Sequence, residues 1–285
     1  MLFKTTVIIG LGIIGGSLAG ALKKFGVSER LIGITRSDAY KRAANIGLID
    51  IGYPLDNLGS VLKDVDLIIL AVPIRKICAF IPEIIPIVKQ GCIITDVGST
   101  KHAIIAVSNT FSREGVFFIG GHPMAGSEKT GFEAGSAELF QNRPYAIVKG
   151  ENTPDEIVTK ISEMVTKIGA IPIQLDSKTH DRIVAGISHL PQMLAIALMN
   201  VIGKENDQDK RFFQMSGPAF IEMTRIAGSS FSVWEDIIIS NRLNVSNMLQ
   251  NLTAELERLQ KSVEKLSTKK DFEQANAYRK RLLNG

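Results

Sequence analysis

Residues 5–17 read Thr-Thr-Val-Ile-Ile-Gly-Leu-Gly-Ile-Ile-Gly-Gly-Ser, and this stretch decides the first half of the fold. Residues 5–9 predict a short buried strand, and a helix is expected directly after the glycines. Gly10, Gly12 and Gly15 form a G-x-G-x-x-G motif in the strand-to-helix context that makes such a motif informative. The first glycine permits a tight turn, the second a close approach to a pyrophosphate, and the third helix packing on the strand. The stretch therefore predicts dinucleotide binding.

The run at residues 7–22 carries no charge and could be mistaken for a signal peptide or a membrane span. It contains five glycines and is shorter than the roughly 20 residues that a bilayer crossing needs. No other segment is expected to reach such a span. The sequence thus predicts no membrane partner.

The composition suits a globular protein with a small-molecule ligand. The chain has 285 residues, 45% of them hydrophobic, and a net charge of +4 without a dense Lys/Arg run. Small anionic ligands are therefore expected before nucleic acid. Cys78 and Cys92 lack CxxC spacing, so neither a disulfide framework nor a metal site is predicted, and a reducing cytoplasm fits best.

Short apolar runs alternate with helical stretches over residues 1–175. Strands are predicted at 5–9, 31–35, 67–71, 92–96, 116–120, 145–148 and 170–175. Helices are predicted at 13–25, 38–45, 74–88, 100–111 and 154–168. This alternation indicates an α/β, Rossmann-type, doubly wound and mainly parallel sheet, which forms a dinucleotide-binding domain.

Residues 176–285 predict a second, all-α domain that begins with Asp176 or Ser177 as the N-cap of its first helix. A heptad pattern of apolar residues runs through the last long helix, at Val245, Leu249, Leu252, Leu256, Leu259, Val263 and Leu266. Such a seam requires a packing partner, which is either the domain itself or a second subunit.

The end of the second predicted strand bears on the choice of cofactor. NAD enzymes usually carry an acidic residue there, but this chain has Thr35, Arg36 and Ser37. A guanidinium and a hydroxyl suit a ribose 2′-phosphate, so NADP is the preferred cofactor and NAD a possible one. Alternatively Arg36 is a solvated surface residue, and the nearby Asp38 keeps this reading open.

In an open parallel sheet, ligands lie outside the carboxyl ends of the strands. The candidates at these positions are Val72 and Pro73 beside a cofactor ring, Ser99 and Lys101 at a helix start, and His122 with Glu128 near by. Ile13 and Ile14 join the glycines at the phosphates. A histidine at such a place can take the proton of a substrate hydroxyl as hydride leaves, so His122 is the predicted general base.

The helical half offers His189 and Arg225, polar residues that interrupt apolar sequence and must be paired or face a cleft. Arg225 could bind a substrate carboxylate, although an internal salt bridge is equally compatible with the pattern. His102 is expected on an exposed turn, and His180 is interpreted as a solvated or capping residue at a helix start.

Together the motifs resemble the prephenate/arogenate dehydrogenase family of tyrosine biosynthesis. The resemblance rests on residues 10–17, on Asp-Val-Gly-Ser-Thr-Lys at 96–101, on His-Pro-Met-Ala-Gly-Ser-Glu-Lys-Thr-Gly at 122–131, on Ser-His-Leu-Pro-Gln at 188–192, on Thr-Arg-Ile-Ala at 224–227, and on Trp234. The second histidine motif following the first at a distance is the specific part of the pattern.

The resemblance implies oxidative decarboxylation of prephenate to 4-hydroxyphenylpyruvate with hydride transfer to NAD(P). His122 would promote deprotonation of the ring hydroxyl, with Ser99 orienting it. The substrate-binding residues implied are His189, Arg225, Glu128, Ser127, Lys101 and Trp234. A homodimer through the C-terminal helices is also implied, and any tyrosine inhibition would have to act at the active site.

Three alternatives stay open. Residues 214–220 contain no acidic residue to pair with an ammonium, which favours prephenate over arogenate, although an arogenate or dual-specificity enzyme is the alternative. A β-hydroxyacid dehydrogenase would need a lysine on the first long helix, and residues 183–202 have none. A non-catalytic NADP sensor would have a blocked pocket, which the set of polar candidates argues against.

Overall fold

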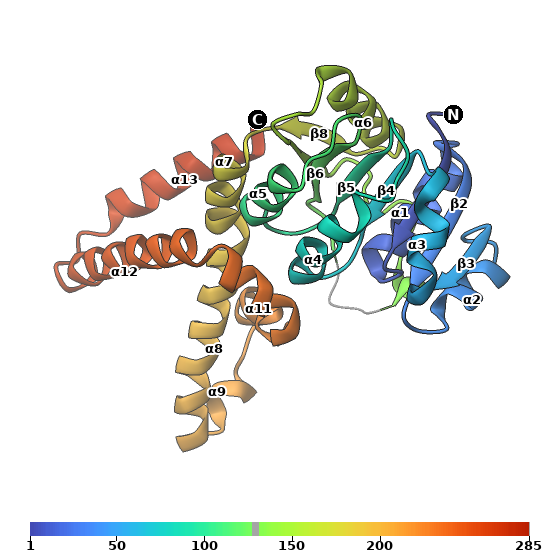
Figure 1. Cartoon of the computed structure of the whole chain (residues 1–285). Coiled ribbons are helices and arrows are strands. Elements are labelled where there is room, and N and C mark those ends of the chain that lie inside the picture. The colour runs from blue at the N-terminus through green and yellow to red at the C-terminus, as the bar shows by residue number, and fades with distance from the viewer. Residues whose placement is uncertain (127–130, 285) are drawn as a thin grey trace. The chain divides into compact units, whose positions relative to one another are not determined.

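The computed structural model describes residues 1–126 and 131–284, and the chain divides into two compact units (Figure 1). The first unit comprises Met1–Val184 together with Gly228–Asn241. The second comprises Ala185–Ala227 and the chain from Arg242 onward.

An eight-stranded sheet in the order β3-β2-β1-β4-β5-β6-β7-β8 forms the centre of the first unit (Figure 1). Its strands are β1 (Phe3–Ile9), β2 (Ser28–Thr35), β3 (Ile51–Pro54), β4 (Leu67–Leu70), β5 (Ile93–Asp96), β6 (Phe117–Pro123), β7 (Pro144–Lys149) and β8 (Ile171–Gln174). All neighbouring strands are parallel except β6 and β7. The predicted doubly wound, mainly parallel sheet is therefore confirmed, with β3 as a strand that the sequence pattern had not indicated.

Helices cover both faces of this sheet. They are α1 (Ile13–Lys24), α2 (Ala39–Asn45), α3 (Leu58–Val61), α4 (Ile74–Ile84), α5 (His102–Thr110), α6 (Asp155–Lys167), α7 (Ser177–Val184) and α11 (Phe231–Ser240), with the short turns η1 (Leu55–Asn57), η2 (Leu62–Asp64) and η3 (Phe132–Ala134). One core contains apolar residues of α1, α2 and α6. The other contains those of α3, α4 and α5 together with Ile237 of α11. The central strands are consequently buried on both sides, as parallel sheets require, whereas the edge strands β3 and β8 are half-buried and largely exposed, respectively.

The glycine turn after β1 lies at the point where the strand order reverses, between β1 and β4. Gly10 has a φ of +100°, and a Cβ there would lie 2.2 Å from the carbonyl oxygen of Ala71. A Cβ on Gly15 would lie 2.0 Å from the carbonyl oxygen of Gly10. By contrast, a Cβ on Gly12 would meet nothing within 4 Å. The turn is thus closed against β4 but open above Gly12.

The second unit is helical, which confirms the predicted all-α C-terminal region. It contains η4 (Ala185–His189), α8 (Leu190–Gln208), α9 (Arg211–Gln214), α10 (Pro218–Thr224), η5 (Arg225–Gly228, whose last residue falls in the first unit), α12 (Arg242–Glu264) and α13 (Lys269–Asn284). In the heptad seam Val245 is buried, whereas Leu256 and Val263 are exposed. Leu266 lies beyond the end of α12 with a φ of +51°. The seam therefore ends one turn earlier than the sequence pattern predicted.

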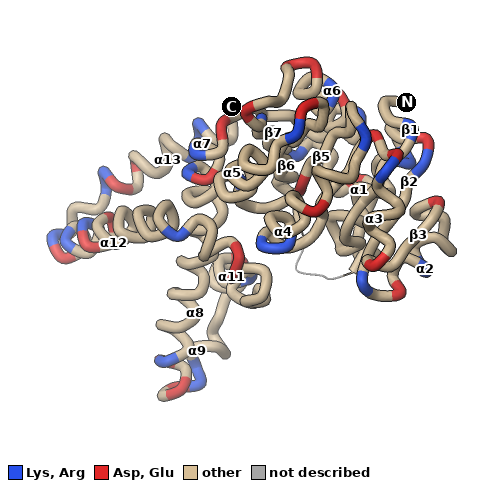
Figure 2. Tube along the Cα trace, in the orientation of Figure 1, with Lys and Arg blue, Asp and Glu red and all other residues tan. Residues whose placement is uncertain are grey.

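Most of α8 carries no charged side chain, as Figure 2 shows. By length and composition alone, the continuous helical run Ser177–Gln208 is apolar enough to cross a membrane, and 28% of its most apolar stretch is buried. The expectation that no further segment reaches such a span was therefore wrong for this helix by length and composition. Apolar helices of subunit interfaces have the same composition.

We expect Gly15→Ala to destabilise the first unit, because the added methyl group would meet the backbone of Gly10. Overpacking costs about 1–3 kcal/mol, and the gain in helix propensity from Gly to Ala recovers about 1 kcal/mol at most. The urea midpoint should therefore fall for Gly15→Ala and stay near the wild-type value for Gly12→Ala. Equal midpoints for the two variants would contradict the observed packing.

Candidate active site

A buried ion pair organises the carboxyl end of the sheet. Asp96, the last residue of β5, accepts hydrogen bonds from the backbone N–H groups of Gly98 (2.7 Å) and Gly121 (3.2 Å). Its carboxylate also forms an ion pair with the ammonium of Lys101, and both side chains are fully buried. Burial lowers the pKa of Lys101, while the charge of Asp96 opposes that shift. The pair connects the ends of β5 and β6 and the start of α5.

His122 lies at the end of β6 and is almost completely buried. Its Nδ1 lies 2.9 Å from Nε2 of His180, and the two rings meet edge to face. His180 in turn places its Nδ1 2.8 Å from Oδ1 of Asp181. The three side chains form a continuous buried chain of hydrogen bonds, so the interpretation of His180 as a solvated or capping residue was wrong.

Asp181 is the fixed end of this chain. Its Oδ1 accepts a hydrogen bond from the backbone N–H of Lys101 (2.7 Å), and its Oδ2 accepts one from that of His102 (3.0 Å). Its backbone carbonyl accepts a hydrogen bond from Nδ2 of Asn241, which follows α11. Helices α5, α7 and α11 are thereby connected at one residue.

The other candidates of the first unit surround this edge of the sheet. Ser99 is half-buried in the loop between β5 and α5. Lys101 was a candidate for substrate contact, but its ammonium is fully buried against Asp96, which favours a structural role instead. Ser127 and Glu128 lie outside the described residues. The arrangement thus brings His122 and the loop of Ser99 to one edge.

Trp234 lies on α11, is half-buried and packs against the core on one face of the sheet. Helix α11 is held at the start of α4 because Asp236 accepts the backbone N–H of Arg75 (3.0 Å) and forms an ion pair with its guanidinium. Val72 and Pro73 directly precede α4. The predicted cofactor-ring residues and Trp234 therefore come from two elements that contact each other.

His189 and Arg225 belong to the second unit. His189 is buried at the end of η4, and Arg225 is exposed at the start of η5. The buried Gln192 of α8 donates a hydrogen bond from Nε2 to the carbonyl oxygen of Ile226 (2.9 Å). This bond attaches the segment of Arg225 to the helix that follows His189.

The start of α1 fits the diphosphate of a dinucleotide. Gly12 is the N-cap without a side-chain cap, and open space lies above it. The first backbone N–H groups of a helix have no intrahelical acceptor, so those of α1, including Ile13 and Ile14, are suited to phosphate oxygens. At the end of β2, Thr35 is half-buried, and Arg36 and Ser37 are exposed.

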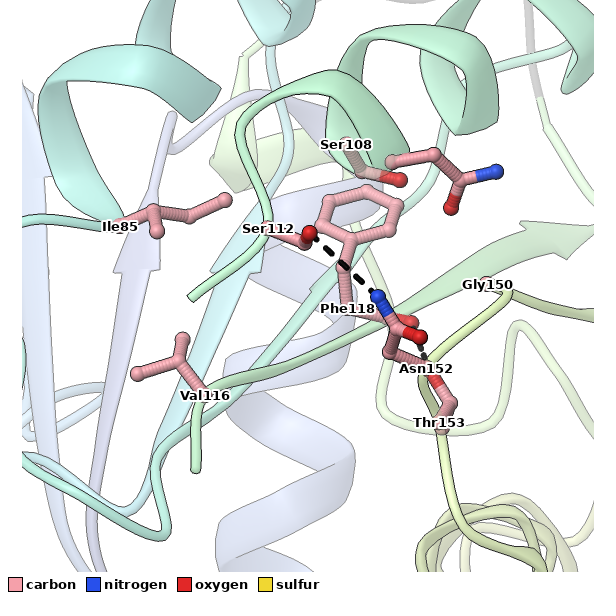
Figure 3. A pocket seen from close by; sticks show the side chains of 9 residues that line it. Ile85, Ser108, Ser112, Val116, Phe118, Gly150, Asn152 and Thr153 are labelled. Atoms are coloured by element: carbon pink, nitrogen blue, oxygen red, sulfur yellow. Dashed lines mark hydrogen bonds between the residues drawn. The ribbon is translucent and has the colours of Figure 1, made fainter. Parts of the chain in front are cut away.

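One hollow of the first unit is too small for a substrate. The cavity in Figure 3 lies at the opposite end of β6 from His122, between Phe118, Ser112 and Asn152. Its volume of about 20 Å³ suits one water molecule. Among residues 1–126 and 131–284, no group of three His, Cys, Asp or Glu residues could hold a metal ion. The thiols of Cys78 and Cys92 are free, and burial raises the pKa of Cys92 to about 12.

Sequence reasoning missed His180, Asp181 and the structural role of Asp96. A signal for the first two existed: Val184 is buried on α7, and residues one turn before it share its helix face. Asp96 ends an apolar strand and precedes Val97 and Gly98, a pattern that gives no indication of which backbone groups would bond to its carboxylate.

These features define a dinucleotide-dependent dehydrogenase with a helical second unit. Two family descriptions match the chain: "Prephenate dehydrogenase, nucleotide-binding domain" over residues 18–174 and "Prephenate dehydrogenase, dimerization domain" over residues 176–278. The chain belongs to the prephenate dehydrogenase family. The family resemblance and the prediction of an oxidoreductase are both confirmed.

Individual relatives agree with this assignment. A prephenate dehydrogenase of Lactococcus lactis is 33% identical over 90% of this chain and 70% of its own length. A cyclohexadienyl dehydrogenase of Zymomonas mobilis is 29% identical over 92% and 89%. The crystal structure of Synechocystis arogenate dehydrogenase aligns with a TM-score of 0.84 at 27% identity, covering 98% of this chain and 99% of that one. Relatives named for either substrate thus share the fold.

We expect Lys101→Met to lower the free energy of unfolding by about 3–5 kcal/mol, because it leaves the Asp96 carboxylate buried without its counter-ion. Asp96→Asn combined with Lys101→Met should be more stable than Lys101→Met alone, since the unpaired charge is gone. Chemical denaturation of both variants, with the exposed Lys76→Met as the control, checks this. Wild-type stability of the single variant would contradict a buried ion pair.

Proposed function

We propose that this protein catalyses the oxidative decarboxylation of prephenate to 4-hydroxyphenylpyruvate, coupled to hydride transfer to NADP. The observation that carries the proposal is His122, a buried histidine at the carboxyl end of the sheet whose Nδ1 is engaged by His180. Family membership supports the reaction class. An arogenate or dual-specificity dehydrogenase is the alternative, which the relative from Synechocystis supports.

The residues of this chain have a limited task in such a reaction. A nicotinamide, when bound, supplies the hydride acceptor. His122 accepts the proton of the ring hydroxyl at the carbon that loses hydride, and Ser99 orients the pair. Loss of the ring carboxylate as carbon dioxide then restores aromaticity, so the protein has to position the reactants and remove one proton.

Anionic groups of the substrate need cationic or hydrogen-bonding partners. We assign this role to Arg225 and His189, because a guanidinium binds a carboxylate through two hydrogen bonds and Arg225 is exposed. Glu128 and Ser127 are proposed to contact the substrate, and Trp234 to contribute an apolar wall. Lys101 acts through Asp96 and is proposed not to touch the substrate.

The proposed preference for NADP rests on the residues after β2. Arg36 is exposed, and among the described residues no carboxylate lies within ion-pair distance of it. Asp38 is instead 3.3 Å from the ammonium of Lys41. An unengaged guanidinium suits a 2′-phosphate. One structure of the prephenate dehydrogenase of Aquifex aeolicus contains NAD+, so use of NAD is the alternative.

We further propose a cytoplasmic homodimer formed through the second unit, without membrane or nucleic-acid partners. The match to a dimerization domain supports the dimer. Exposed apolar residues on α8, α12 and α13, among them Val201, Leu256 and Phe272, suit an interface.

The proposed reaction is tested with prephenate and arogenate, each with NAD and NADP, by following the reduced cofactor. We expect the fastest turnover with prephenate and NADP, and a fall in kcat of roughly 10²–10⁴-fold for His122→Asn with little change in cofactor affinity. The exposed His102→Gln is the control. Cofactor binding without turnover in all four mixtures would favour an NADP sensor.

We expect Arg36→Ala to lower kcat/KM for NADP roughly 10–100-fold, because hydrogen bonds to a charged group contribute about 1.5–3 kcal/mol. The value for NAD should change less than about threefold. Arg30→Ala, at the opposite end of β2, is the matched control. Equal losses with both cofactors would show that Arg36 does not select the 2′-phosphate.

A further inference from the structure

We propose that His180 is a positioning residue that holds His122 in the tautomer protonated on Nδ1, so that Nε2 of His122 carries the lone pair that receives the substrate proton. The inference deepens the proposed function and rests on it for the role of His122. It stands on the hydrogen-bonded chain from His122 through His180 to Asp181.

Asp181 is held as a hydrogen-bond acceptor. Its two carboxylate oxygens accept the backbone N–H groups of Lys101 and His102 at 2.7 and 3.0 Å. Because each oxygen accepts an N–H group, the carboxylate acts as an acceptor in this chain. Its main chain is also fixed, because the carbonyl of Asp181 accepts Nδ2 of Asn241 at 2.7 Å. Asp181 therefore cannot offer a proton to its neighbour.

The direction of these hydrogen bonds determines which nitrogen of His180 is protonated. Its Nδ1 faces an acceptor at 2.8 Å and must be the protonated nitrogen, so in the neutral ring Nε2 is the acceptor. Nε2 of His180 then requires a donor, and the atom at 2.9 Å is Nδ1 of His122. In the neutral ring of His122 the proton is consequently on Nδ1, and Nε2 is the basic atom.

Proton transfer from the substrate creates a positive charge on His122. When His122 becomes an imidazolium, it stays hydrogen-bonded through His180 to the carboxylate of Asp181. Among the described residues near this chain, Asp96 and Lys101 pair with each other, His102 faces Ser177, and burial raises the pKa values of Cys78 and Tyr145. Asp181 is the carboxylate at the end of this chain, and its charge stabilises the imidazolium.

The tautomer is directly measurable without substrate. Long-range ¹H–¹⁵N spectra of protein labelled at histidine, recorded near pH 8 where an ordinary imidazole is neutral, distinguish a protonated Nδ1 from a protonated Nε2. The chain has four histidines, so single His→Gln variants assign the signals. We expect Nδ1–H for both His122 and His180. An Nε2–H form of His122 would overturn the proposal even if the enzyme is active.

Three variants separate positioning from packing. His180→Gln keeps an acceptor for His122 Nδ1–H and a donor for Asp181, so kcat should fall less than about tenfold. His180→Phe fills the space without an acceptor, and Asp181→Asn removes the negative charge from the end of the chain and the acceptor for the N–H of His102. For both we expect kcat to fall on the order of 10²-fold, with KM and the cofactor Kd changing less than about threefold.

The pH profile supplies the second readout. In Asp181→Asn the imidazolium loses its stabilising charge, so the acid limb of the kcat profile should move to lower pH relative to wild type. Equal losses in all three variants, in proportion to their melting temperatures and with an unmoved acid limb, would overturn the proposal. If wild type has no turnover while His122 is protonated on Nδ1, the proposed reaction fails and the tautomer assignment holds.

Discussion

A negative charge without access to water has to be surrounded by donors, and the carboxyl end of this sheet is arranged around that requirement at Asp96. The carboxylate is bonded by the N–H groups of Gly98 and Gly121 and by the ammonium of Lys101. The first two donors hold the end of β6, and hence His122, at a fixed distance from the end of β5. The third fixes the start of α5, whose N–H groups then bind Asp181.

The order of the strands places the glycine turn and the buried histidine at separate positions along the same edge of the sheet. The glycine turn at the β1–β4 switch point is closed against Ala71 but open over Gly12, which suits it to phosphates. The buried histidine lies at the end of β6, three strands from β1. An extended dinucleotide is the kind of ligand that connects two such positions, since its diphosphate and its reactive ring lie far apart. The glycine turn and the surroundings of the histidine therefore depend on different local features of the sequence.

Sequence patterns predicted the parts of this protein that depend on local rules. The glycines, the parallel strands and the change to helices after residue 175 all follow from periodicity and from the φ values that glycine permits. Strand β3 was missed because residues 51–54 are only half-buried at the sheet edge and include a glycine and a proline. His180 was missed because its burial depends on β6 and α5, which are distant in sequence.

The position of His180 between a carboxylate and the proposed base solves an electrostatic conflict. A carboxylate in direct contact with His122 would favour the imidazolium before any substrate arrived, and a protonated ring cannot accept a proton. A carboxylate placed one imidazole further away still dictates which nitrogen is protonated, because hydrogen-bond polarity passes through the neutral ring. Its Coulomb attraction, however, is weaker at the greater separation. In the proposed mechanism, this separation weakens the attraction before substrate binds while the carboxylate still orients the base and stabilises the imidazolium.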